Sequence, residues 1–271
     1  TLDAINVLGY SVPKHKRIDL EYGITLNIEG EKIRLEKAEH IMGASQVIVN
    51  TDGEEVAYTG DFRNPGKGTP ILNPDVLIID ATYGHPTHKR PFKEESDMLF
   101  SDYIKDAILY GPVRIYAYYG KIQEVMRILR QFDVKIPFIV AGKVSELTKV
   151  ALKHGIKIDD VFDEKSEEGR EIIKDKMYIS FHHATEFKRR DKNAINFLLD
   201  GWQINEFIKR IDQKSYIIGF SSHADFEDTI YYIENTSADI IVVDASRSKY
   251  AKDLIEYGKK YVTKKSFILL P

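Results

Sequence analysis

Between residues 24 and 59, apolar and polar residues alternate in short runs that are separated by turn residues. The runs cover residues 24–28, 32–36, 45–50 and 55–59, and Glu29-Gly30 and Asp52-Gly53 lie between neighbouring runs. Alternation with a period of two is typical of half-buried strands, and an Asp-Gly pair between such runs indicates a hairpin turn. The pattern predicts a β-meander in the N-terminal third of the chain.

The pattern changes after residue 76. An apolar strand is predicted at 76–80 and a helix at 94–109, and from residue 112 onward strands and helices alternate. The predicted strands are 113–118, 137–140, 177–181, 195–199, 216–220 and 240–243, and the predicted helices are 122–132, 144–154, 204–211, 226–234 and 250–257. Residues 159–176 are charged and predicted to be irregular. Strands that alternate with helices of this length indicate parallel β-α units, and therefore a second domain that differs from the meander.

Length and composition set limits on the class of protein. The chain has 271 residues, 43% of them hydrophobic and 30% charged, which suits one large or two modest globular domains. No run approaches the roughly 20 apolar residues that span a bilayer, and the first ten residues lack the pattern of a secretory signal. We expect no membrane insertion and a cytoplasmic location.

The charged residues narrow the possible chemistry. The chain contains no cysteine, so any metal ion must be held by His, Asp or Glu. Its net charge of −3 gives no overall attraction to nucleic acid, so a nucleic-acid enzyme would need local basic patches. Three basic stretches are present, although such stretches are usually solvated faces: Lys14, Lys16 and Arg17; Lys89 and Arg90; Lys188, Arg189, Arg190 and Lys192.

Four residues with useful side chains each stand at or just after the end of a predicted strand: His40, Asp61, Asp80 and His223. Enzymes built on sheets place catalytic groups at such positions, because the sheet fixes the geometry while the loops admit the substrate. Each residue alone is more often a turn former, a helix cap or a structural histidine. Together, the four can converge on one site.

The order of several segments is more specific than any single residue. The segments EHIMGASQVIV, EEVAYTGDF, PDVLIIDATYG, YGKIQEV, DGWQ and FSSHADFEDTI together resemble the β-CASP nucleases of the metallo-β-lactamase fold. The small members described as mRNA 3′-end-processing-factor-like proteins or DNA-ligase-associated exonucleases are the most similar. The resemblance implies an α/β fold, an αββα sandwich incomplete at its N-terminus with an inserted α/β β-CASP domain. The implied domains are 1–109 and 213–271 for the sandwich and 110–212 for the insertion.

The resemblance also implies roles for particular residues. His40 and Asp61 match zinc ligands of a site that holds two ions in the family. Asp80 and His223 match a catalytic pair in which the carboxylate orients the imidazole, so that the imidazole can protonate the leaving group or hold the phosphate. Asp244 stands where many members have a last metal-binding histidine, and either replaces it as a ligand or marks a lost position.

Three further residues are expected to bind the substrate. Ser222 and Tyr83 neighbour the catalytic pair in sequence, and Lys121 matches the basic or polar residue at the start of the first β-CASP helix, where N–H groups and a cation favour phosphate. The implied activity is metal-dependent hydrolysis of phosphodiester bonds in single-stranded RNA or DNA.

One departure from the family pattern leaves two hypotheses open. The His-x-His-x-Asp-His segment that supplies most zinc ligands is absent, and we expect it upstream of Thr1, where the chain begins abruptly within what resembles the following helix. With that segment, the protein is predicted to be a zinc-dependent nuclease. Without it, the ligand set is incomplete, and the chain is a catalytically inactive paralogue that binds nucleic acid or scaffolds an active partner, either as a homodimer or with a related β-CASP subunit.

Overall fold

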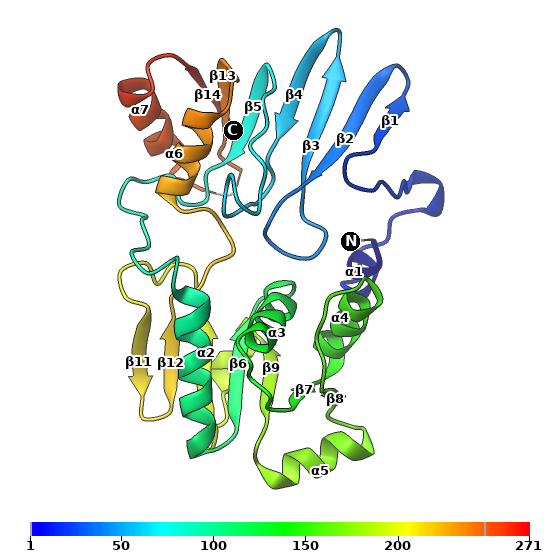
Figure 1. Ribbon diagram of the computed structural model, residues 1–271, viewed down its shortest axis with the longest axis vertical. Helices are drawn as coiled ribbons and strands as arrows, with labels where there is room; N and C mark the ends of the chain where they lie inside the picture. The colour runs from blue at the N-terminus through cyan, green and yellow to red at the C-terminus, as the bar shows by residue number, and fades with distance from the viewer. Residues whose placement is uncertain (1, 247) are drawn as a thin grey trace. The chain divides into compact units, whose positions relative to one another are not determined.

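The computed structural model describes residues 2–246 and 248–271 (Figure 1). The chain divides into two compact units: unit 1 comprises residues 2–12 and 91–221, and unit 2 comprises residues 13–90 and 222–271. In each unit the described residues form a seven-stranded mixed sheet flanked by helices. The predicted α/β fold class is therefore confirmed, and its arrangement is consistent with a metallo-β-lactamase sandwich that carries a β-CASP domain. The domain limits at residues 109 and 212 stay a prediction.

The sheet of unit 2 has the strand order β1-β2-β3-β4-β5-β13-β14. The strands are β1 (Thr25–Ile28), β2 (Glu31–Lys37), β3 (Ser45–Thr51), β4 (Glu54–Tyr58), β5 (Val76–Asp80), β13 (Ile240–Asp244) and β14 (Ser266–Leu270). Strands β1 to β4 pair antiparallel in sequence order, which confirms the predicted meander. Strands β4, β5, β13 and β14 pair parallel, so their carboxyl ends lie at one edge of the sheet.

Two helices pack on the sheet of unit 2: α6 (Phe226–Asn235) and α7 (Ala251–Tyr261). Helix α6 begins at a capping residue, Asp225, whose carboxylate accepts a hydrogen bond from the backbone N–H of Asp228 at 3.0 Å. Its buried Tyr232 donates to Gln46 Oε1 at 2.7 Å and accepts from the Leu72 N–H at 3.0 Å. Because these contacts hold α6 against the strands, the segment just before the helix is also held.

The sheet of unit 1 has the strand order β11-β12-β10-β6-β9-β7-β8. Its strands are β6 (Val113–Ala117), β7 (Phe138–Val140), β8 (Val161–Asp163), β9 (Ile179–His183), β10 (Ile195–Leu199), β11 (Ile208–Asp212) and β12 (Ser215–Ile218). All neighbouring pairs are parallel except β11 and β12. The predicted β-α units are therefore confirmed. A parallel sheet needs cover on both faces, which explains why its central strands β6, β7, β9 and β10 are buried at most of their positions.

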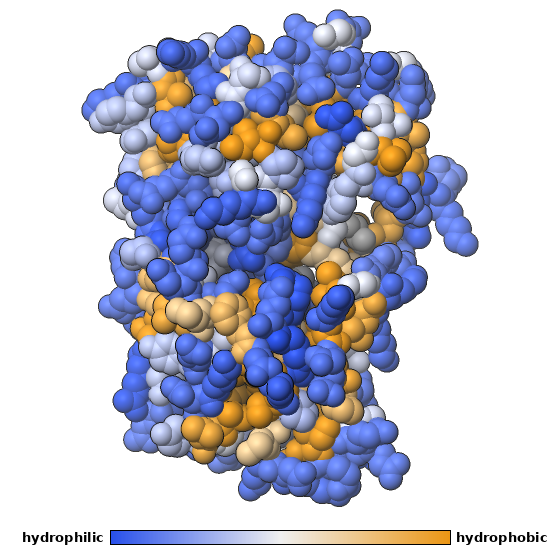
Figure 2. Space-filling model, viewed as in Figure 1, coloured by the Kyte–Doolittle hydropathy of each residue, from blue (hydrophilic) through white to orange (hydrophobic). Residues whose placement is uncertain are grey.

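The helices of unit 1 cover this sheet and supply most of the remaining core. They are α1 (Leu2–Val7), α2 (Ser96–Ala107), α3 (Lys121–Gln131), α4 (Gly142–Lys153) and α5 (Glu167–Asp175), and short 3-10 turns lie at η2 (Ile108–Tyr110) and η3 (Ala184–Arg189), with η1 (Lys14–Lys16) in unit 2. Figure 2 shows a mainly hydrophilic surface with scattered hydrophobic patches on one face. Within the described residues, every helix is too short or too polar to span a bilayer.

Two local predictions were wrong. The helix expected at 204–211 is instead strand β11, because Ile204, Ile208 and Ile211 have helical spacing but the chain forms an antiparallel hairpin with β12. The stretch 159–176, expected to be irregular, contains β8 and the helix α5, which Ser166 caps by accepting from the Gly169 N–H at 3.0 Å. In the first segment the pairing with β12 outweighs the helical spacing of the isoleucines. In the second, the cap at Ser166 supports a short helix although the segment is highly charged.

Candidate metal centre

The directions of four strands bring the predicted site residues of unit 2 to one edge of its sheet. Asp80 and Asp244 are the last residues of the parallel strands β5 and β13, and they are direct partners in the register. Asp61 follows the neighbouring strand β4 after Thr59 and Gly60. His40 lies in the loop between β2 and β3, and this loop reaches the same edge because β3 begins beside the end of its antiparallel partner β4.

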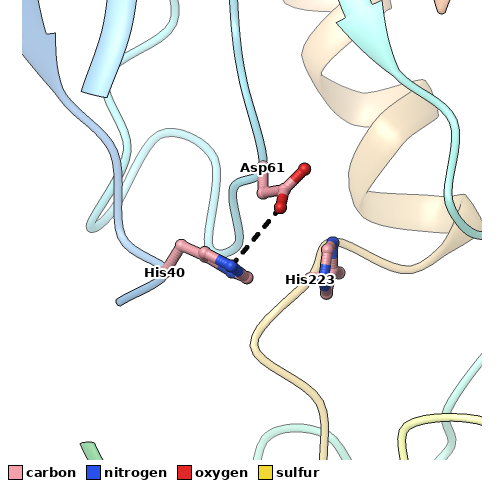
Figure 3. A group of neighbouring side chains, drawn as sticks. All are labelled: His40, Asp61 and His223. Atoms are coloured by element: carbon pink, nitrogen blue, oxygen red, sulfur yellow. Dashed lines mark ion pairs between the residues drawn. The ribbon is translucent and has the colours of Figure 1, made fainter. Parts of the chain in front are cut away.

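His40, Asp61 and His223 form a close group of possible metal ligands, which we call the donor group (Figure 3). One nitrogen or oxygen atom from each residue lies within 4.8 Å of the other two. His40 Nε2 is 3.5 Å from Asp61 Oδ2, with side-chain exposures of 11% and 18%, and the two imidazole rings are 4.6 Å apart between centroids. Three segments far apart in sequence thus place two imidazoles and a carboxylate around one point.

The hydrogen bond of His40 determines which nitrogen faces the donor group. His40 Nδ1 lies 2.8 Å from the backbone carbonyl oxygen of Ser222. A carbonyl oxygen only accepts, so Nδ1 carries the hydrogen and the lone pair of the neutral ring is on Nε2, the atom nearest Asp61. A neutral imidazole fixed through its other nitrogen is the usual form of a metal-binding histidine. Ser222, predicted to bind the substrate, is buried and positions His40 through its backbone.

Asp80 contacts His223, and the role of the two residues as a catalytic pair stays a prediction. Asp80 Oδ2 is 3.4 Å from His223 Nδ1, and Asp80 Oδ1 accepts from the backbone N–H and the hydroxyl of Thr82 at 3.0 and 2.8 Å. The backbone N–H of Asp80 donates to the Thr59 hydroxyl at 3.1 Å. This buried carboxylate is held by several hydrogen bonds, and it places the Nδ1 hydrogen of His223 toward itself, so that Nε2 carries the lone pair.

Arg90 holds the loop that carries His223, a role that the sequence analysis missed. Its Nη2 donates to the His223 carbonyl oxygen at 2.6 Å, and its backbone N–H donates to Asp225 Oδ2 at 3.0 Å. Its guanidinium also lies over the Tyr83 ring at 4.6 Å, and that ring is 6.3 Å from the His223 ring. The Lys89-Arg90 pair had the sequence pattern of a solvated basic stretch, yet Arg90 is buried. The predicted substrate residue Tyr83 is also buried beside it.

Asp244 lies outside the donor group and interacts with Tyr58. The Tyr58 hydroxyl donates to Asp244 Oδ2 at 2.9 Å, and Asp244 Oδ1 accepts from the Ser246 N–H at 2.8 Å. Burial, together with the neighbouring carboxylate of Asp244, raises the pKa of Tyr58 to about 12. Asp244 is also the strand partner of Asp80. Its role as a metal ligand stays a prediction.

Unit 1 carries different side chains at the carboxyl edge of its parallel strands. Tyr118 follows β6, His183 ends β9, and Trp202 follows β10, and these three strands are neighbours. Tyr118 and Trp202 are 60% and 52% exposed. We call these three residues the aromatic edge. This edge is not visible in the sequence, because single aromatic residues after strands are indistinguishable from core residues without the order of the strands.

Lys121 begins helix α3 in unit 1, directly after Gly120, whose φ of 84° is in the region that favours glycine. The Lys121 ammonium donates to the carbonyl oxygen of Phe220 at 3.2 Å. This contact keeps its charge at the start of the helix, where backbone N–H groups also favour an anion. Its role in substrate binding stays a prediction.

The donor group fits a zinc ion by its chemistry. Two imidazole nitrogens and one carboxylate oxygen are common zinc ligands, and three protein ligands with a fourth position for water or substrate are typical of catalytic zinc sites. The residues that the structure describes assemble one such group of three, whereas the resemblance implies two ions. The group therefore suits one ion.

Comparisons with known proteins give relatives for part of the chain. A protein of Acidianus ambivalens named "Uncharacterized protein in lig 3′region" is 59% identical over 138 residues, which are 51% of this chain and 99% of that protein. The "Probable RNase MJ4" of Methanocaldococcus jannaschii is 26% identical over 152 residues, 50% of this chain and 35% of the ribonuclease. Further matches over similar stretches of this chain are also named as ribonucleases. The chain thus spans well under half the length of these ribonucleases, and it has distant, partial homology to β-CASP ribonucleases.

A solved structure supports the fold over the whole chain. The crystal structure of a protein of unknown function from Enterococcus faecalis V583 matches with a TM-score of 0.64 at 14% identity, covering 100% of this chain and 71% of that one. This likeness concerns the fold alone. No family model matches the chain.

Proposed function

The chain belongs to the same family as the Acidianus ambivalens protein, and from this and its partial homology to β-CASP ribonucleases we propose that it is a metal-dependent nuclease. Its proposed reaction is hydrolysis of phosphodiester bonds in single-stranded RNA or DNA. The observation that carries the proposal is the donor group, in which His40, Asp61 and His223 meet within 4.8 Å beside the held carboxylate of Asp80.

His40 and Asp61 are proposed zinc ligands, and His223 is the candidate third ligand of the donor group. The carbonyl of Ser222 fixes the His40 ring with the lone pair on Nε2, which is 3.5 Å from the Asp61 carboxylate. A bound zinc ion would stabilise negative charge on the phosphate and lower the pKa of a water molecule. The Asp61 carboxylate would offset part of the positive charge of such an ion and, with His40, would help to hold it.

His223 is the proposed proton donor or phosphate contact. Asp80 holds its Nδ1 hydrogen and orients the ring, so that a proton on Nε2 can be given to the departing oxygen of the substrate. Arg90 fixes the backbone of the same loop by its contact with the His223 carbonyl oxygen. Because His223 is also a member of the donor group, its role as a ligand is separated from its role as an acid by measuring metal content in His223→Ala.

Single-stranded nucleic acid is the proposed substrate class because of the aromatic edge of unit 1. Exposed aromatic rings bind bases by stacking, and stacking requires bases that are not already paired. Tyr118 and Trp202 are the exposed rings at this edge, and Lys121 adds a cation after the same strand as Tyr118. These side chains support a strand held by its bases and phosphates.

The experiment is hydrolysis of end-labelled single-stranded RNA and DNA by the full chain in the presence of zinc. We expect cleavage that Asp61→Ala reduces by at least about a hundredfold, since even residues that only support metal ligands cost about 10- to 100-fold when changed. Asp19→Ala, the same change at an exposed position of unit 2, is the control and keeps full activity. A wild-type chain that binds nucleic acid without cutting it would instead support the inactive, scaffolding paralogue.

A further inference from the structure

A basic pocket lies in unit 1 at the edge of the sheet where β10 and β12 begin. It has a volume of about 400 Å³ and lies between residues 188–192, at the end of η3 and just after it, and the hairpin that joins β11 to β12. Its lining residues are Lys188, Arg190, Lys192, Asp212, Gln213, Lys214 and Ser215. We call this the basic pocket, and it includes most of a basic stretch that neither the donor group nor the aromatic edge uses.

The charges in the basic pocket do not cancel. Arg190 Nη2 pairs with Asp212 Oδ2 at 2.7 Å, and Arg190 Nε donates to the Ser215 hydroxyl at 2.8 Å. This pairing holds the pKa of Asp212 at about 2, so the aspartate stays charged and matches the arginine. Asp212 is the one carboxylate among the lining residues, so three lysines remain without a balancing acid in the lining.

Arg190 is also fixed in place, as a preformed site requires. Its guanidinium lies 4.8 Å from the centre of the Phe187 ring, in addition to its contacts with Asp212 and Ser215. The Lys214 ammonium donates to the carbonyl oxygen of Asn193 at 3.3 Å, which directs it back toward the segment before β10. Two of the cations are therefore held by the fold, while Lys188 and Lys192 are exposed and can adjust to a ligand.

Positive charge continues beyond the basic pocket. Residues 188–192 and 209–214 contain seven lysine or arginine residues and two aspartates, although the whole chain has a net charge of −3. Lys209 and Arg210 are exposed on the edge strand β11, and Arg210 Nε contacts the carbonyl oxygen of Asp212 at 3.0 Å. A strip of cations that extends past a single pocket suits a ligand with repeated negative charges better than one small anion.

We propose that the basic pocket binds a backbone phosphate of a nucleic-acid strand, and that Lys188, Lys192 and Lys214 are the cations that neutralise the strand there. The choice of nucleic acid among polyanions rests on the proposed function, whereas the binding itself needs no cleavage. The pocket is at the opposite edge of the sheet from the aromatic edge, about 17 Å away for a five-residue strand such as β6. It is thus a second contact, separate from base stacking.

The test is binding of a fluorescein-labelled oligouridylate or oligothymidylate to the full chain, measured by anisotropy in EDTA so that no hydrolysis occurs. The triple change Lys188→Ala, Lys192→Ala and Lys214→Ala is expected to weaken binding about ten- to a hundredfold at ~0.1 M salt. It is also expected to reduce the slope of log affinity against log salt by about 2, because each lost phosphate contact to a single strand contributes about 0.7. The matched control is Lys135→Ala, Lys143→Ala and Lys174→Ala, which removes the same charge elsewhere in unit 1.

A second variant has the opposite expected sign. Asp212→Asn removes the carboxylate from the pocket lining and leaves Arg190 unmatched, so binding should tighten a few-fold, which damage to the fold would not produce. Circular dichroism of each variant confirms folding, and Asp212→Asn decides the outcome if the triple variant does not fold.

Three results would overturn the proposal. They are equal weakening by the pocket and control triples, no tightening with Asp212→Asn, and competition by inorganic phosphate as effective as that by the oligonucleotide, which would assign the pocket to a small anion. Failure of the proposed function has a different signature, since a chain that cuts nothing can still show the pocket-dependent binding. Conversely, if cleavage depends on Asp61 but the pocket variants bind the oligonucleotide as the wild type does, the nuclease function stands and the proposed phosphate site is rejected.

Discussion

The two units place different chemistry at the same position of their sheets. At the carboxyl edge of parallel strands, unit 2 has the donor group and Asp80, which are carboxylates and imidazoles largely shielded from solvent. Unit 1 has the aromatic edge at the corresponding position, where Tyr118 and Trp202 are mostly exposed. A strand end supports a reactive group when hydrogen bonds hold it, and a binding surface when the side chain is left in contact with water.

This difference predicts different consequences of mutation. Changes to the donor group or to Asp80 in unit 2 should lower the rate at which bound substrate is hydrolysed, because these groups form the proposed reaction site. Changes in unit 1 should weaken binding or stability and leave the rate of the bound substrate unchanged. Each of the following experiments asks whether the separation holds.

Apart from changes to the proposed zinc ligands, the largest effect is expected for Asp80→Asn. The amide does not orient the Nδ1 hydrogen of His223 as a carboxylate does, so kcat should fall about 10- to 100-fold with little change in KM. Steady-state kinetics on a labelled oligonucleotide, together with metal analysis, measures this, and Asp19→Asn is the control. A rise in KM alone would place Asp80 in substrate binding.

The mostly buried His182 of unit 1 is expected to affect the stability of the fold and not the reaction. Burial lowers the pKa of His182 to about 4, and nearby Arg114 acts in the same direction. In the unfolded chain His182 therefore binds a proton below about pH 6.5, whereas in the folded chain it binds one only below about pH 4. The free energy of unfolding that this neutral histidine contributes is present at pH 7 and is lost as the pH falls through this range.

The change His182→Phe removes this titration and keeps a ring to stack on Tyr116. Between pH 7 and pH 5 the wild type should lose about 2 kcal/mol more stability than the variant. Urea unfolding at the two pH values measures the difference. Identical losses in both proteins would show that His182 is not held neutral by the fold.

A smaller effect is expected at the aromatic edge. Tyr118→Ala or Trp202→Ala should each weaken binding of a single-stranded oligonucleotide about tenfold, within the range of 1–3 kcal/mol per stacked base, and leave kcat unchanged. Tyr110→Ala is the matched control, because Tyr110 is 79% exposed but lies in η2, away from the edge. Fluorescence anisotropy gives the affinities, and an equal loss in the control would remove the aromatic edge from the substrate surface.

The smallest effect is expected for Tyr58→Phe. The change removes the hydroxyl that donates to Asp244 Oδ2. Because this carboxylate is buried, the loss of the hydrogen bond should lower the free energy of unfolding by about 1 kcal/mol. Urea unfolding measures it, and an unchanged stability would contradict a structural role for the pair. Zinc content measured on the same variant shows whether Asp244 also contributes to the metal site.

The fold was largely accessible from the sequence where the periodic signal was long. The meander of residues 24–59 and the parallel units after residue 112 follow from alternation and from regular strand-helix spacing. Strand β11 was not predicted, because three isoleucines at helical spacing indicate a helix. Its strand conformation follows only from its pairing with β12. The helix α5 was missed because most of its nine residues are charged and its apolar side chains are the adjacent Ile172 and Ile173, which show no helical periodicity.

The site was accessible only in part. The order of strand ends suggested that His40, Asp61, Asp80 and His223 converge, and the structure brings them together. The supporting contacts were not visible, because a tyrosine on a strand and an arginine in a basic pair look ordinary in sequence. Only the three-dimensional contacts reveal that Arg90 holds the His223 loop.

The central claim, that the donor group binds a metal ion, is tested most directly by zinc titration calorimetry of the metal-stripped full chain. The wild type and the control Asp19→Ala should bind zinc stoichiometrically, and Asp61→Ala should bind it at least about a hundredfold more weakly. Equal zinc binding by Asp61→Ala and the wild type, or no zinc binding by the wild type, would contradict it.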